Sequence, residues 1–142
     1  MAVDREELAW AAGFFDGEGC TSVYSRSLQS RDYWVVQLSV SQIHADTLER
    51  FRAAVGVGQM FGPYSRTGND IYTFKVSGYE KVQAIIAMLW PWLTTHKKEQ
   101  AVLALQRYQS TYVAPLTPEE RTAHRRKYQR EWKASRKVSH GS

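Results

Sequence analysis

Hydrophobic and polar residues alternate in several short stretches of this chain. Between positions 33 and 42, Val36, Leu38 and Val40 share one parity, and most of the residues between them are polar. A period of two with a single apolar face indicates a half-buried strand. The same alternation recurs elsewhere, so we expect strands near residues 20–29, 33–42, 58–64 and 70–76.

The stretches between these strands carry apolar residues three and four positions apart, which predicts helices. Asp4 is placed to cap the first helix, and Glu7 stands three residues later, as in a capping box. The expected helices run from Asp4 to the glycines at 17 and 19, over 44–55 up to Gly56, from a capping box at Ser77–Glu80 to Pro91, from Thr95 to about Tyr112, and onward from Pro118.

This order predicts an α+β fold, αββαββα, followed by a helical tail. Each strand pair is apolar on one parity, so a four-stranded antiparallel sheet would carry helices on one face and a polar surface on the other. We expect one domain over 1–116 and a basic extension over 117–142.

The predicted polar face carries hydrogen-bonding side chains at strand spacing, which suits base edges and phosphates in a DNA major groove. An ordinary sheet that shows water one polar face would look the same. The candidate DNA-binding residues are Tyr24, Arg26, Tyr33, Gln37, Ser39, Ser41, Gln59, Thr73 and Lys75.

Composition limits the class of protein. The 142 residues fit one compact domain, 43% of them are hydrophobic, and no apolar run is long enough to span a bilayer. A single cysteine excludes an internal disulfide and a cysteine-rich zinc site. The charged N-terminus is unlike a signal peptide, so we expect an intracellular protein with no membrane partner.

The net charge of +5 lies in the tail. Residues 117–142 hold eight Lys and Arg against three acidic residues, whereas the rest of the chain holds eleven of each. A basic segment beside a neutral domain favours a polyanion partner, usually nucleic acid. We therefore expect the tail, with its charges spread around a helix, to add phosphate contacts; the alternative is a solvated helix without a partner.

The stretch from Ala9 to Gly19 combines small residues with acids. Ala9, Gly13 and Gly17 recur every four positions with Ala12 between them, and such a face lets two helices approach closely. Glu18 follows between two glycines. If the helix pairs with a second copy, two carboxylates meet, and a divalent cation between them would relieve their repulsion.

The string Ala11-Ala12-Gly13-Phe14-Phe15-Asp16-Gly17-Glu18-Gly19 resembles the LAGLIDADG motif of homing endonucleases of the single-motif, homodimeric type, and the resemblance extends over about residues 5–112. It implies a saddle-shaped sheet on double-stranded DNA and Mg²⁺, or Mn²⁺ in its place, bound by Glu18. It also implies a water-organising residue at Gln42 and a basic residue at Lys97, with Lys98 as the alternative. The implied dimer interface is Ala9, Ala12, Gly13 and Asp16, with Asp16 more an intrachain brace than a metal ligand.

The implied function is a site-specific endonuclease that makes metal-dependent double-strand breaks at a long, roughly palindromic site. Its partners would be duplex DNA and a second copy of the chain, with no small-molecule substrate. One departure is Ile43-His44-Ala45-Asp46, where some relatives have basic residues. Two alternatives stay open: a non-cleaving RNA maturase or DNA-binding regulator on the same fold, and an unrelated basic RNA-binding domain.

Overall fold

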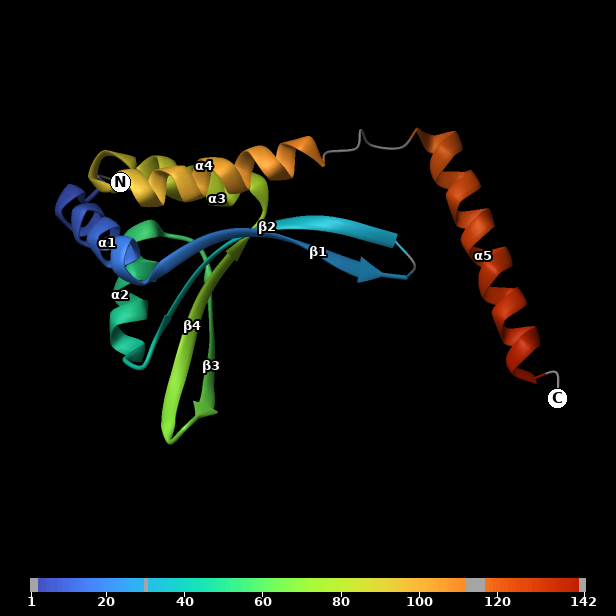
Figure 1. Cartoon of the computed structure of the whole chain (residues 1–142), viewed down its shortest axis with the longest axis horizontal. Coiled ribbons are helices and arrows are strands. Elements are labelled where there is room, and N and C mark those ends of the chain that lie inside the picture. Colours follow the sequence, from blue (N-terminus) through green and yellow to red (C-terminus); the bar gives the residue numbers. More distant parts are fainter. Residues whose placement is uncertain (1–2, 30, 112–116, 141–142) are drawn as a thin grey trace. The chain divides into compact units, whose positions relative to one another are not determined.

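The structure is a computed structural model that describes residues 3–29, 31–111 and 117–140. The chain forms two compact units, Met1–Thr111 and Tyr112–Ser142, and each is described by itself (Figure 1). The predicted domain boundary at residue 116 stays a prediction, since residues 112–116 lie outside the described part.

The first unit has the predicted αββαββα order followed by the further helix α4, and the described part of the second unit is one helix. The elements are α1 (Arg5–Glu18), β1 (Gly19–Leu28), β2 (Arg31–Gln42), α2 (Ala45–Val55), β3 (Gln59–Arg66), β4 (Asn69–Ser77), α3 (Tyr79–Leu89), the 3₁₀ turn η1 (Trp90–Trp92), α4 (Thr95–Ser110) and α5 (Pro118–His140). None of the described helices is both long enough and apolar enough to cross a membrane.

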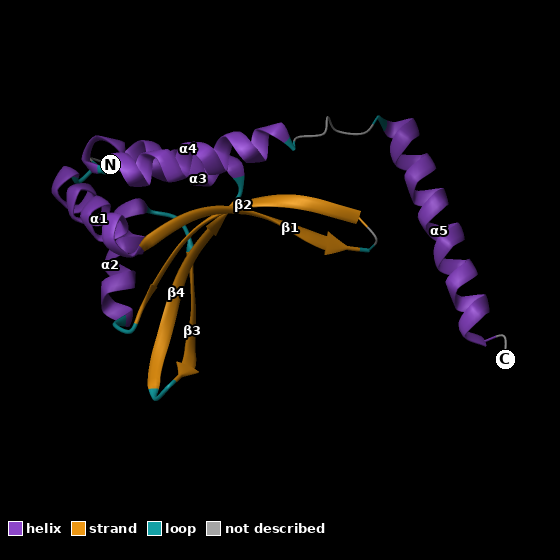
Figure 2. Cartoon of the chain, viewed as in Figure 1, coloured by secondary structure: helices purple, strands orange, loops and turns teal. Residues whose placement is uncertain are grey.

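The four strands form one antiparallel sheet in the order β1-β2-β4-β3. Both hairpins join sequential strands, and β2 and β4 meet at the centre. Figure 2 shows α1 to α4 together on one side of the sheet, while the two hairpins diverge from the centre and leave the other side open. The predicted fold class is confirmed.

The hydrophobic core lies between the sheet and these helices. Val36, Leu38 and Val40 of β2 are fully buried or nearly so, as their shared parity predicts. At the centre, the Phe51 ring of α2 meets the Phe74 ring of β4 edge-on, with centroids 5.0 Å apart. The period-two pattern therefore identified the buried face of the sheet.

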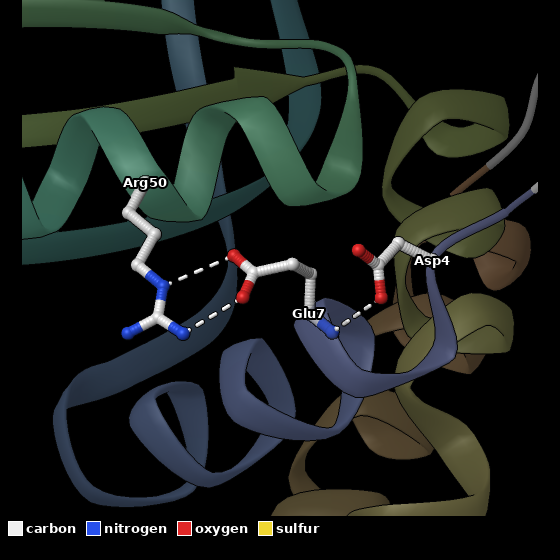
Figure 3. Close-up of polar contacts among 3 residues, drawn as sticks. All are labelled: Asp4, Glu7 and Arg50. Atoms are coloured by element: carbon white, nitrogen blue, oxygen red, sulfur yellow. Dashed lines mark hydrogen bonds and ion pairs between the residues drawn. The ribbon is translucent and has the colours of Figure 1, made fainter.

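The start of α1 differs from its prediction in one respect (Figure 3). Asp4 caps the helix as expected, accepting a hydrogen bond from the Glu7 amide at 3.1 Å. Glu7 does not return the bond, because its carboxylate accepts two hydrogen bonds from the Arg50 guanidinium of α2, at 2.7 and 3.0 Å. These charge-assisted bonds hold the pKa of Glu7 below its usual value. The predicted capping box is therefore wrong, and Glu7 instead joins α1 to α2.

The capping box predicted at Ser77 is also wrong. Ser77 ends β4, and Gly78 caps α3 with a φ of 112°, a backbone conformation that favours glycine. Two other helix ends match their predictions. Gly56 ends α2 in the left-handed conformation, and Pro118 is the first residue of α5.

Candidate active site

All nine candidate DNA-binding residues lie on one face of the sheet. Cross-strand partners point to the same side, and the register pairs Arg26 with Tyr33, Ser39 with Lys75 and Ser41 with Thr73. The remaining members follow by alternation along the same strands and by the pairing of Gln59 with Lys75. This is the face opposite the buried residues of β2, and the nine side chains are half-buried or exposed.

Hydrogen bonds order part of this polar face. The Tyr24 hydroxyl donates to Gln37 Oε1 at 3.0 Å, so the Gln37 amide nitrogen remains available as a donor. The hydroxyl oxygens of Ser41 and Thr73 lie 3.0 Å apart across β2 and β4. Preset side chains of this kind lose less conformational freedom on binding than free ones would.

A concave region on this face includes residues that sequence reasoning missed. It is lined by Tyr24, Arg26, Gln37, Val57, Gly58, Gln59, Phe61, Lys75, Val76, Ser77 and Lys81. The Lys75 ammonium lies 5.5 Å from the centre of the exposed Phe61 ring. Lys81 comes from α3, and strand alternation carries no signal for a helix residue that borders the sheet.

The end of α1 is fixed closely around Glu18. Gly19 begins β1 under the Phe15 ring, and a Cβ added at Gly19 would lie 2.0 Å from a ring carbon. Lys97 of α4 donates a hydrogen bond to the Gly19 carbonyl. Glu18 itself is exposed as the last residue of α1, and no described residue forms a hydrogen bond or ion pair with its carboxylate.

Asp16 joins this end of α1 to α4 of the same chain. Its carboxylate accepts hydrogen bonds from the amide and the hydroxyl of Thr94, at 3.1 and 3.0 Å. Thr94 is the N-cap of α4, so the contact ties the C-terminal turn of α1 to the start of α4. That attachment places Lys97, one turn into α4, beside Gly19.

Gln42 and Lys97, the other two predicted site residues, lie near the segment that follows Glu18. Gly19 pairs with Val40, and Gln42 lies two residues further along β2, where its Oε1 accepts a hydrogen bond from the Ile43 amide at 2.8 Å. Lys98 lies elsewhere, with its ammonium 4.9 Å from the centre of the Trp90 ring. Of the two lysines, Lys97 is the one that contacts the segment after Glu18.

The outer face of α1 is partly as predicted. Gly13 and Gly17 are exposed, and a Cβ added to either would meet no described atom within 4 Å outside its own helix. Ala9 is half-buried on the same side. Ala12 is fully buried among the core side chains of its own chain, so it does not share the exposed face of Gly13 and Gly17.

No protein-family model matches the sequence, and no curated protein matches it. Among solved structures, the chain superposes on the homing endonuclease I-CvuI in complex with its target, with a TM-score of 0.63, 27% identity, and coverage of 75% of this chain and 68% of that one. The chain has the LAGLIDADG homing-endonuclease fold.

Two further structures carry the same fold at lower identity. The intron-encoded homing endonuclease I-CeuI, complexed with DNA, matches with a TM-score of 0.57 and 12% identity over 78% of this chain and 55% of that one. The LAGLIDADG meganuclease I-CpaMI, bound to uncleaved DNA, matches with a TM-score of 0.59 and 16% identity over 72% and 37%. I-CvuI itself has been crystallised on DNA in the presence of 2 mM Ca and of 2 mM Mg.

This LAGLIDADG-fold chain offers few ligands for a metal by itself. Among the described residues, no cluster of three or more His, Cys, Asp or Glu side chains could hold an ion. Mg²⁺, however, usually binds through one or two carboxylates together with water and substrate phosphates. One exposed carboxylate, at Glu18, fits that pattern, since water and a substrate phosphate would supply the other ligands.

Proposed function

We propose that this protein is a site-specific DNA endonuclease that acts as a homodimer with Mg²⁺ held at Glu18. The observation that carries the proposal is the end of α1. An exposed carboxylate stands beside a helix face on which Gly13 and Gly17 have no packing role within the chain. Glycine inside a helix costs roughly 0.5–1 kcal/mol relative to alanine, so a close neighbour would explain why it stands there.

Pairing of α1 with a second α1 places two Glu18 side chains together. Each chain carries one motif, so cutting both DNA strands needs both copies. A two-fold dimer contacts its two half-sites with the same residues, which predicts a roughly palindromic target. The open sheet faces would then contact the duplex on either side of the central cleft, through the polar face and Lys81.

The bound cation, when present, would polarise the scissile phosphate and lower the pKa of its attacking water. The chain's own residues have separate tasks. Glu18 supplies oxygen ligands, and Gln42 holds water through its amide. Lys97 uses one ammonium hydrogen on the Gly19 carbonyl, and its other two donors are available to the negative charge that develops on the phosphate. Hydrolysis breaks one phosphorus–oxygen bond as water forms another.

The alternative on this fold is a non-cleaving RNA maturase or DNA-binding regulator. Such a protein has no need for a carboxylate at the end of α1, and the exposed Glu18 therefore favours cleavage. The two functions differ in one observable, since only the endonuclease breaks a bound duplex when Mg²⁺ is supplied.

The test uses duplexes with a randomised segment. Duplexes are first enriched by binding in Ca²⁺, and the selected pool is then incubated with the protein in Mg²⁺. We expect double-strand breaks with the wild-type chain and with Glu80→Gln, a control change of the same type on α3. Glu18→Gln should abolish the breaks while preserving binding. Breaks that survive in Glu18→Gln would refute the proposed site, and binding without breaks in the wild type would favour the regulator.

A further inference from the structure

The described side chains of helix α5 are all exposed. It begins with a true capping box, in which the Thr117 amide donates to Glu120 at 2.8 Å and the Glu120 amide donates to the Thr117 hydroxyl at 3.2 Å. Every described side chain from Thr117 to Arg136 is exposed. A helix gains most of its stability from the packing of one face, which these side chains lack.

The basic residues of α5 are not spread around the helix as the sequence had suggested. With about 100° of rotation per residue, six of the seven basic residues between Thr117 and Arg136 share one half of the circumference. We call this half the basic arc, and it consists of Arg121, Arg125, Arg126, Arg130, Lys133 and Arg136.

The opposite side of α5 has a different character. Lys127 lies there with Glu120 and Glu131, and the small residues Ala123 and Ala134 lie between Lys127 and the basic arc. Among the acidic residues of the helix, Glu119 shares the side of the basic arc, in the first turn, where a negative charge favours the helix N-terminus.

Two exposed aromatic residues lie at one edge of the basic arc, Tyr128 just outside it and Trp132 between Arg121 and Arg125. The side chains of Tyr128 and Trp132 are 37% and 47% exposed, and they follow one another one turn apart. The Arg136 guanidinium lies 4.5 Å from the centre of the Trp132 ring. Charge on half of a helix with flat apolar groups at its margin complements a polyanion that also presents stacked bases and sugars.

We propose that α5 is a second DNA-binding element, which lies in a major groove of the duplex beyond the segment bound by the sheet. The proposal rests on the proposed function, since it takes duplex DNA as the partner. The width of the basic arc favours binding in the major groove over binding along a single phosphate backbone. A helix in the major groove has a phosphate strand on each flank and base edges beneath it, whereas a helix on one backbone needs only a narrow stripe of charge.

The experiment measures how the affinity for a random-sequence duplex depends on salt, with the full chain. The arc variant carries Arg125→Gln, Arg126→Gln and Arg130→Gln, because glutamine keeps a helix propensity close to that of arginine. The control carries Ala123→Glu, Lys127→Gln and Ala134→Glu, which lowers the net charge by the same three units on the opposite side.

Each phosphate contact adds about 0.9 to the slope of log affinity against log salt, so the arc variant should lose about 2.7 for each chain that binds. For that slope difference, the ratio of wild-type affinity to arc-variant affinity should fall about 40-fold between 50 and 200 mM salt. The control should keep the wild-type slope. Helical content, followed by circular dichroism, should rise when duplex is added to the wild-type chain and rise less with the arc variant.

Equal slopes for the two variants would overturn the proposal, because net charge alone would then account for binding. Loss of binding to phosphatidylserine vesicles by the arc variant, with an unchanged slope on duplex, would assign the basic arc to a membrane instead. The proposed nuclease function would be refuted by other results, namely no cleavage by the wild type or undiminished cleavage by Glu18→Gln. The random duplex tests α5 without any target site.

Discussion

A single methyl group on the outer face of α1 tests whether that face is paired. In Gly13→Ala the new Cβ meets no described atom within 4 Å outside its own helix, so the chain itself accommodates it. Alanine is favoured over glycine in a helix interior by roughly 0.5–1 kcal/mol. An unpaired chain should therefore become more stable, with a rise in Tm of about 2–4 °C.

A paired helix gives the opposite result. If the two α1 helices approach through their glycines, the added methyl groups force the backbones apart. Overpacking of close contacts costs about 1–3 kcal/mol, which corresponds to a dimer Kd roughly 5- to 150-fold weaker.

Sedimentation equilibrium across a dilution series measures the dimer Kd, and thermal unfolding at the lowest concentration measures the stability of the chain. Gly13→Leu should weaken the dimer further. Ala84→Leu, which adds bulk to an exposed position of α3, should leave the Kd unchanged. A Gly13→Ala chain that is more stable and dimerises like the wild type would refute the reasoning.

Three further changes test the contacts at the two ends of α1. Gly19→Ala places a methyl group against the Phe15 ring and should destabilise the chain by about 1–3 kcal/mol in urea unfolding; a change below 0.5 kcal/mol would contradict that packing. Asp16→Ala removes the acceptor of the two Thr94 hydrogen bonds and should cost roughly 1 kcal/mol, whereas Asp46→Ala on α2 should cost less. The lowered pKa of Glu7 means that its pairing with Arg50 stabilises the fold above the unfolded value of 4.5 and is lost as pH falls below it. On acidification, the Tm of Arg50→Gln should therefore fall less than the Tm of the wild type. Equal falls in Tm would argue against the ion pair.

Local sequence patterns predicted the fold because each pattern depends only on residues close together in the sequence. The alternation of β2 assigned Val36 and Leu38 to the buried face, and the register then placed the polar residues of both hairpins on the other face. Asp4 and Gly56 mark helix ends through bonds and backbone angles within a few residues. Nothing distant has to be known for these predictions.

Contacts between distant residues could not be predicted in the same way. Glu7 has the spacing of a capping box, but Arg50, 43 residues away, provides a stronger partner for its carboxylate. The spacing of Ala12 among small residues suggested the outer face, yet packing of α1 turns it into the core. Lys81 reaches the sheet face only because α3 packs beside β2 and β4.

Covalent cross-linking tests the pairing of the two Glu18 positions most directly. Glu18→Cys is made in a Cys20→Ser background, with Glu80→Cys in the same background as a control. A disulfide forms without backbone movement only when the two Cα atoms lie about 4.4–6.8 Å apart. We predict that the position-18 cysteine joins two chains rapidly under mild oxidation and that the control does not. Cross-linking no faster than in the control, or a chain that stays monomeric on DNA, would contradict the account.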